Sequence, residues 1–410
     1  MCRLIKKTKM SEFEFIALMA FLMANVALAI DAILPGLTNI GVSLNVAEGS
    51  DIQGVITMIF LGIGVGELIF GTLSDSFGRK PMVYLGVGLF VIASIISATA
   101  TSIETMLFGR VLQGIGLSAP RTVSMAIIRD SYQGNQMARI MSFISAIFIL
   151  VPMVAPMIGQ LILNTLNWQA IFYFQILFIL ITIFWFKYRQ EETLIKEKRT
   201  RLSRKLFTNG FKEFVKHKQT LIYTIMAGLM EGIFILYLST SKQIFQDQYH
   251  LIKEFPYVFA ALSFVFGIST FLNGRFVVKY GMHNLVTISL YLFSLTSLIY
   301  LFAFYNSENP SITILMLFLF FQFLFLGFIF GNLSALAMQP IGHIAGIGAA
   351  IFSFVSMALG VFIANLIGEF ILTTVHPLFY AFFATGLVAL ILLNIIIFGK
   401  QKLEKFQLLD

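Results

Sequence analysis

Long apolar runs constrain this chain more than any other feature of its sequence. They recur twelve times, near 13–36, 51–73, 82–100, 103–127, 137–163, 168–186, 219–240, 254–275, 284–304, 311–336, 342–366 and 377–398. A helix that crosses a bilayer core about 30 Å thick needs roughly 20 mostly apolar residues. Strands of an outer-membrane barrel are about ten residues long and alternate in hydrophobicity, whereas these runs are continuous. The sequence therefore predicts an all-α polytopic membrane protein with twelve transmembrane helices.

Composition agrees with this class. The chain is 58% hydrophobic and only 12% charged, far from the balance of a soluble globular protein. Its single cysteine, Cys2, excludes an internal disulfide. The first apolar run is too long for a signal peptide and lacks a small-residue cleavage site, so no cleaved leader is expected.

The basic residues predict the orientation of the chain in the membrane. If the N-terminus is cytoplasmic, all but four of the 28 Lys and Arg residues are on cytoplasmic segments or tails, as the positive-inside rule requires. The predicted parts are a cytoplasmic tail (1–12), a six-helix bundle (13–186), a basic cytoplasmic linker (187–218), a second six-helix bundle (219–398) and a cytoplasmic tail (399–410). Both termini are then cytoplasmic, and the expected location is a bacterial inner membrane. The net charge of +8 follows from this topology, so no nucleic-acid partner is expected.

Paired glycines suggest that the two bundles are repeats. Gly71 and Gly78 follow the second apolar run, and Gly274 and Gly281 follow the eighth with the same spacing. This pattern indicates two pseudo-symmetric six-helix bundles around a central cavity. Val278 stands where the second copy would carry the equivalent of Asp75, so the role of Asp75 belongs to one half only.

The charged stretch "GTLSDSFGRKP" (71–81) lies between two apolar runs and resembles the loop signature of the major facilitator superfamily. "MLFGRVLQGIG" (106–116) is similar to the helix-four signature of proton-coupled members, with Arg110 and Gln113 at matching positions. "AMQPIGHIAGIGAA" (337–350) resembles a segment of the bicyclomycin/chloramphenicol-resistance branch of twelve-helix drug:proton antiporters. The resemblance spans nearly the whole chain and implies the major facilitator fold.

A fourth segment, "VPMVAPMIGQ" (151–160), resembles the helix-five antiporter signature of the same superfamily. Its matching residues are Pro152, Pro156 and Gly159, while Ala155 and Gln160 replace the first and last glycines of that signature. The match implies antiport, and the two replacements keep other transport modes open.

The loop stretch predicts a cytoplasmic gate. Asp75 at the end of one helix can pair with Arg79, and Asp130 at the end of another can supply a second carboxylate. Bidentate arginine–carboxylate geometry makes a latch that must break when that side opens. The gate residues would be Gly71, Asp75, Gly78, Arg79, Lys80 and Asp130. The alternative is a solvated turn that merely obeys the positive-inside rule.

Asp31 is the first candidate for proton binding because ionisable groups inside a bilayer are costly and usually functional. The resemblance implies the same role, since multidrug members carry an acid in helix one that serves as proton and cation site. Arg110 is its expected partner. The alternative is an acid capped by water at the membrane edge, because Pro35 predicts that the helix ends nearby.

Three further charged residues complete the candidate set. Arg121 shares a helix face with Arg110, so it either faces the cavity beside Gln113 and favours an anionic or zwitterionic substrate, or snorkels to the interface. Glu67 and Glu231 are candidates for a second proton-coupling acid, and Glu231 could also face the substrate cavity from the second bundle. Each is alternatively a buried structural carboxyl.

The sequence favours a secondary transporter, a proton-coupled antiporter that exports small amphiphilic compounds by alternating access. Export of an endogenous metabolite or siderophore, and uptake of a nutrient, remain alternatives on the same fold. A membrane enzyme or sensor has less support, because no catalytic constellation, nucleotide loop or metal-spaced cluster appears. The expected partners are a small-molecule substrate, protons and the lipid bilayer. The proton gradient replaces any cofactor, and a monomer is expected.

Overall fold

The computed structural model describes residues 10–46, 50–199, 204–305, 308–371 and 373–407. Most of the predicted N-terminal tail, residues 200–203 of the predicted linker and the last three residues lie outside these ranges. Within them the chain forms helices joined by short turns.

The prediction of twelve membrane helices is confirmed. The long helices are α1 (Glu12–Asp31), α3 (Ser50–Phe77), α4 (Arg79–Ala98), α5 (Ile103–Ser131), α6 (Gly134–Thr165), α7 (Gln169–Arg189), α9 (Lys218–Lys242), α10 (Phe255–Tyr280), α11 (Met282–Ala303), α12 (Ile312–Met338), α13 (Ala345–Gly368) and α14 (His376–Gln407). The short elements are η1 (Leu34–Gly36), α2 (Leu37–Ser43), η2 (Lys196–Lys198), α8 (Arg204–Lys216), the π-helical η3 (Gln243–Gln248) and η4 (Gln339–Ile344).

The first helix is shorter than its apolar run predicts. It ends at Asp31 rather than near residue 36, and η1 and α2 follow it. Pro35 explains this end, because a proline ring clashes with the carbonyl of the residue four positions earlier, which is Asp31. Asp31 is therefore placed at the last helical position of α1.

Several other helices extend beyond their apolar runs. Helix α3 continues to Phe77 and α5 continues to Ser131. Hydropathy detects only the part of a helix that sits in hydrocarbon, whereas backbone hydrogen bonding continues into the interface. These polar extensions carry Asp75 and Asp130.

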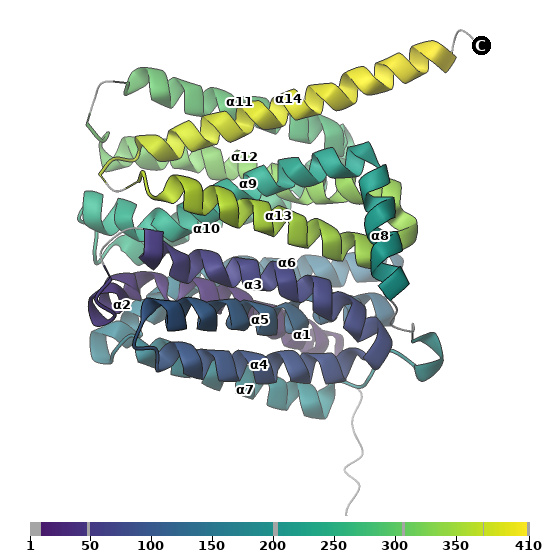
Figure 1. The fold of residues 1–410 in the computed structure, drawn as a ribbon, viewed down its shortest axis with the longest axis horizontal. Coiled ribbons are helices and arrows are strands. Elements are labelled where there is room, and N and C mark those ends of the chain that lie inside the picture. Colours follow the sequence, from purple (N-terminus) through teal and green to yellow (C-terminus); the bar gives the residue numbers. More distant parts are fainter. Residues whose placement is uncertain (1–9, 47–49, 200–203, 306–307, 372, 408–410) are drawn as a thin grey trace, which may run out of the picture.

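The helices form two halves with α8 between them in the chain (Figure 1). In this view most elements of the first half lie in the lower part and those of the second half in the upper part. Helix α3 packs along α13, and α6 packs along α10, so these pairs join the halves. Gly78 and Gly281, at matching points of the halves, both have positive φ angles of 105° and 78°.

The contact line between α3 and α13 runs the full thickness of a membrane. Gln53 contacts Gly368 at one end, Gly64 faces Met357 midway, and Gly71 faces Ala350 near the other end. The two helices are antiparallel and stay in register along this line, which covers about 30 Å at 1.5 Å per residue. We call this contact line between α3 and α13 the seam. The two halves are in contact at both of its ends, so the structure is closed there.

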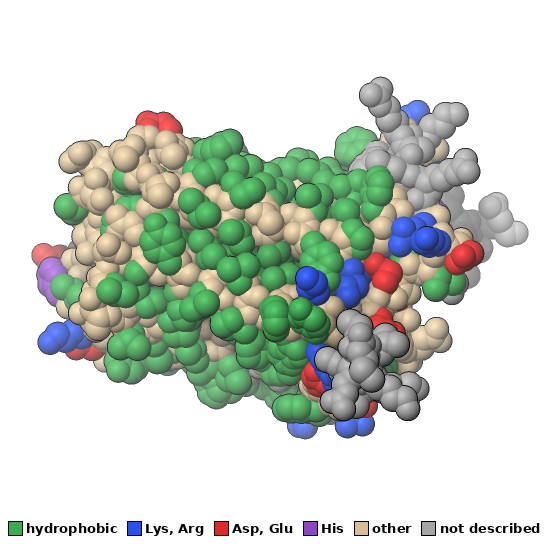
Figure 2. Space-filling view, turned by 90° about the horizontal axis from the view of Figure 1, so that it is seen from below, with side chains coloured by type: hydrophobic (Ala, Val, Ile, Leu, Met, Phe, Trp, Pro, Cys, Tyr) green, Lys and Arg blue, Asp and Glu red, His purple; other side chains and the backbone are tan. Residues whose placement is uncertain are grey.

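Figure 2 shows one face of the molecule, with hydrophobic side chains over the middle and charged side chains gathered toward the ends. We call the end that holds Arg79, Asp130 and α8 the basic end. The end that holds Gln53 and Gly368 is called the opposite end.

Candidate functional site

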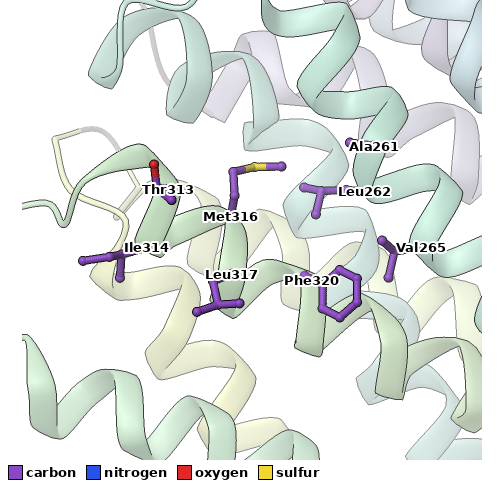
Figure 3. Close-up of a pocket in the computed structure, with 8 residues that line it drawn as sticks. All are labelled: Ala261, Leu262, Val265, Thr313, Ile314, Met316, Leu317 and Phe320. Carbon is purple, nitrogen blue, oxygen red and sulfur yellow. The ribbon is translucent and has the colours of Figure 1, made fainter.

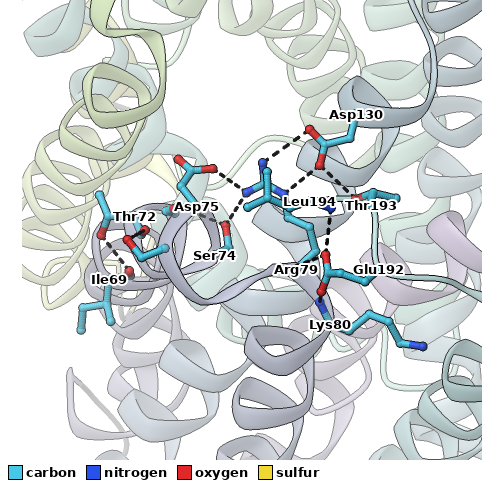
Figure 4. A network of polar contacts seen from close by, with 12 residues as sticks. Ile69, Thr72, Ser74, Asp75, Arg79, Lys80, Asp130, Glu192, Thr193 and Leu194 are labelled. Atoms are coloured by element: carbon cyan, nitrogen blue, oxygen red, sulfur yellow. Dashed lines mark hydrogen bonds and ion pairs between the residues drawn. The ribbon is translucent and has the colours of Figure 1, made fainter. Parts of the chain in front are cut away.

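Arg79 is the centre of a polar network at the basic end (Figure 4). Its side chain is only 7% exposed. The guanidinium donates to Asp130 Oδ2 at 2.9 Å, to Asp75, and to Ser74 Oγ at 2.9 Å. Two carboxylates from the ends of α3 and α5 therefore hold one buried cation at the start of α4. The solvated-turn alternative does not fit so buried an arginine.

Glu192, which follows α7, completes the network and was missed by the sequence analysis. Its two carboxylate oxygens accept from the backbone N–H groups of Arg79 and Lys80, each at 3.0 Å. A negative group here satisfies free donors at the start of α4 and complements the helix dipole. A Cβ on Gly78 would lie only 2.9 Å from Glu192 Oε2, and its φ of 105° also favours glycine. The acid within a basic linker was the signal available in the sequence.

Lys80 and Thr193 make further hydrogen bonds that hold the segment around Glu192 in place. Lys80 Nζ donates to the carbonyl of Lys187 at 3.3 Å and to that of Gln190. Thr193 donates to Asp130 Oδ2 at 2.9 Å. The segment after α7 is therefore fixed to the ends of both α4 and α5.

Asp75 also faces the second half of the molecule. One of its oxygens is 3.7 Å from the position that a Cβ would take on Gly346, in the first turn of α13. The N-terminal end of a helix attracts negative charge. Asp75 thus lies where the Arg79 network approaches the seam between α3 and α13.

We expect Arg79→Ala to weaken closure at the basic end. The change leaves Asp75 and Asp130 without their shared cation, so the closed form loses charge-assisted hydrogen bonds that the open form does not make. Turnover should fall more than apparent substrate affinity. Spectroscopic distances across the basic end report the change, and distributions identical to those of the parent would contradict a latch.

Arg110 is buried completely and joins three helices of the first half. Its Nε donates to the carbonyl of Val55 at 2.7 Å, and both terminal nitrogens donate to the carbonyl of Ala29 at 3.1 Å. Nη1 also donates to Gln113 Oε1 at 2.9 Å, and Gln113 donates to Ser94 Oγ at 2.7 Å. The expected ion pair with Asp31 is wrong for this structure, because backbone carbonyls and Gln113 occupy the guanidinium.

Asp31 is only 4% exposed, and no hydrogen bond or ion pair joins its side chain to another residue in the described ranges. Tyr237 on α9, in the other half, lies close enough to interact with its charge. The Tyr237 hydroxyl is buried and likewise lacks a partner among the described residues. Asp31 therefore lies near the boundary between the halves, not at a water-capped membrane edge.

The residues of the helix-five signature bring α6 against α1 beside Asp31. A Cβ on Gly159 would overlap the carbonyl oxygen of Ala32, the residue after Asp31. Ala155 is buried, and Pro152 and Pro156 lie inside the helix. Gly159 of this signature thus lets α6 approach the backbone next to Asp31.

Arg121 pairs with Glu67 across two helices of the first half. Its Nη1 donates to Glu67 Oε1 at 2.7 Å, with side chains 37% and 9% exposed. Glu231 on α9 interacts electrostatically with both and lies beside Ser356 of α13. Arg121 therefore turns toward α3, where the Glu67 carboxylate balances its charge.

An apolar groove of about 390 Å³ lies elsewhere, between α10 and α12 (Figure 3). Leu262, Met316 and Phe320 are among its lining residues, and none of the lining residues is ionisable. The groove is separate from the buried acids. Among the described residues, no cluster of His, Cys, Asp or Glu has the arrangement of a metal site.

In the part of the chain that the structure describes, twelve membrane helices form two halves, with a charged network at one end and buried acids near their boundary. This is the architecture of a secondary membrane transporter. The chain belongs to the Major Facilitator Superfamily, whose family model matches residues 15–365.

Relatives and a solved structure agree with the family. The chain is 27% identical over 397 residues to the bicyclomycin resistance protein homolog of Haemophilus influenzae, covering 93% of this chain and 95% of that protein. It is 35% identical over 144 residues to the multidrug resistance protein MdtL of Salmonella paratyphi C, covering 35% and 36%. A D-xylose–proton symporter shares the fold at a TM-score of 0.74 and 16% identity, over 93% and 97% of the two chains. The resemblance to the drug-resistance branch is confirmed.

Proposed function

We propose that this chain is a proton-coupled antiporter that exports small amphiphilic compounds of the bicyclomycin and chloramphenicol type. The observation that carries the proposal is Asp31, a buried carboxyl that pairs with no cation of the described residues and lies near the boundary between the halves. The names of the bicyclomycin-resistance and multidrug-resistance relatives support export of drugs.

Asp31 would bind the transported proton. An ionised carboxylate without a partner is costly in a closed, apolar site, whereas water can solvate it once one end opens. The halves therefore close more easily when Asp31 carries a proton, or pairs with a cationic part of a substrate, than when its carboxylate is unpaired. Competition between the two for Asp31 would couple export to proton entry.

The basic end would face the cytoplasm of a bacterial inner membrane. Helix α1 begins and α14 ends there, so both termini would be cytoplasmic. The bundles 13–186 and 219–398 would rock against each other as a monomer. The proton gradient would supply the energy, and no cofactor is needed.

Purified protein in proteoliposomes with an imposed pH gradient tests this function. With bicyclomycin and chloramphenicol as probes, we expect movement of the compound opposite to the proton gradient, and collapse of that movement by a protonophore. Movement in the same direction as protons would instead indicate an importer, an alternative that the Ala155 and Gln160 replacements keep open. No movement of either compound, with gradient-driven movement of an endogenous metabolite, would favour the narrower exporter.

A further inference from the structure

A buried amide clasp joins the two halves at the opposite end. Gln53, at the start of α3, is 1% exposed. Its Nε2 donates to Gln243 Oε1 at 2.8 Å and to the carbonyl of Gly368 at 2.9 Å. Gln243 follows α9 and Gly368 ends α13, so one side chain of the first half binds two elements of the second.

The side chains of the clasp are closely packed, but only some of their hydrogen-bonding groups have partners. A Cβ on Gly368 would overlap the amide oxygen of Gln53, so the close approach requires glycine. Nε2 of Gln243 and of Gln246 are buried without a hydrogen-bond partner in the described ranges. Buried amide groups without partners cost free energy that water relieves on exposure. The closed clasp is therefore held by two hydrogen bonds and opposed by unpaired groups.

The backbone that carries Gln243 of the clasp is not a regular α-helix. Residues Gln243–Gln248 form a π-helical segment that continues α9. Such segments are rare and are frequently found at functional sites, where they break the regular register of a helix. This segment gives the end of α9 a place to bend.

The clasp and the Arg79 network lie at the two ends of one seam. The seam runs from Gln53 and Gly368 to Asp75 and Gly346 between α3 and α13. Alternating access requires one end to separate while the other stays closed. The Arg79 network is charged and lies at the basic end, whereas the clasp is uncharged.

We propose that Gln53, Gln243 and Gly368 form the gate at the opposite end, and that breaking their two hydrogen bonds opens the substrate path there. Gln53 is a positioning residue: it holds the two halves together at the seam and does not contact the substrate. The proposal rests on the proposed transport cycle but on neither the substrate nor the proton site.

Distance measurements between spin labels test the gate without any substrate. In a Cys2→Ser background, labels at Thr101 and Ser311 span the opposite end, and labels at Gln133 and Asn284 span the basic end. We expect Gln53→Leu to raise the ratio of open to closed molecules at the opposite end about tenfold, because the partners lose their donor only in the closed form. The distances at the basic end should not lengthen.

Two other variants complete the test. Gly368→Ala keeps every polar group but pushes the Gln53 amide away, so it should open the same end even if Gln53→Leu folds poorly. Gln322→Leu is the matched control, because Gln322 is also 1% exposed and donates to Ser297 Oγ at 2.7 Å within the second half. The gate is excluded if Gln53→Leu and Gly368→Ala keep the parent distances, or if Gln322→Leu opens the end equally.

Discussion

Asp31→Asn should abolish gradient-driven transport while leaving the fold intact. The substitution keeps the shape of the side chain and removes the titratable group from a buried site where no ion pair to Asp31 is formed within the described ranges. Exchange of labelled for unlabelled compound without a gradient should continue, because it needs no net proton transfer. Uphill accumulation in proteoliposomes should fall to the level of empty vesicles, because no proton movement drives it.

Asp51→Asn provides the control for this change. Asp51 lies at the exposed start of α3, so the same chemical change there should leave coupling untouched. Tyr237→Phe tests the surroundings of the site, and it should alter the pH dependence of transport without abolishing it. Uphill transport by Asp31→Asn at the parent rate would remove Asp31 from the coupling mechanism.

The sequence predicted the fold and the contact between Asp75 and Arg79 because both depend on local patterns. Apolar length fixes membrane helices, and Asp75 near the end of α3 is only four residues before Arg79 at the start of α4, so the short turn between these helices brings them together. The ring of Pro35 likewise fixes where α1 ends. Features of this kind need no knowledge of which helices are neighbours.

The remaining parts depend on tertiary packing, which no single segment encodes. Arg110 meets the carbonyls of Ala29 and Val55 because α1 and α3 surround α5. A backbone carbonyl has no sequence signature. A prediction from charge alone therefore paired Arg110 with Asp31, which is not its partner in the structure. The contact between Gln53 and Gln243 joins residues 190 positions apart and was not visible either.

The pairing of Arg121 with Glu67 changes what its substitution should do. A guanidinium already held by a carboxylate contributes little to the choice between substrates of different charge. Arg121→Gln should therefore change the affinity for a matched neutral and anionic compound equally. The main effect should be on stability, because the change leaves Glu67 buried near Glu231 without its cation.

Removal of one partner from a fully buried ion pair costs about 3–5 kcal/mol. The Arg121 side chain is 37% exposed, so solvent screens part of the interaction, and we expect a loss of about 1–3 kcal/mol in the free energy of unfolding. The double variant Glu67→Gln with Arg121→Gln should recover about half of that loss, since it leaves no unpaired charge in the pair. Denaturant unfolding in detergent of the parent, of each single variant (Glu67→Gln and Arg121→Gln) and of the double variant measures this coupling.

Arg139→Gln is the comparison that separates this pair from an ordinary surface contact. Arg139 is 3.5 Å from Glu12, and both side chains are well exposed, so its substitution should cost less than about 1 kcal/mol. If Arg121→Gln weakens binding of the anionic compound far more than the neutral one, Arg121 must release Glu67 and contact the substrate. Equal affinities together with a measurable coupling to Glu67 would instead establish that the pair joins α3 to α5 beside the seam.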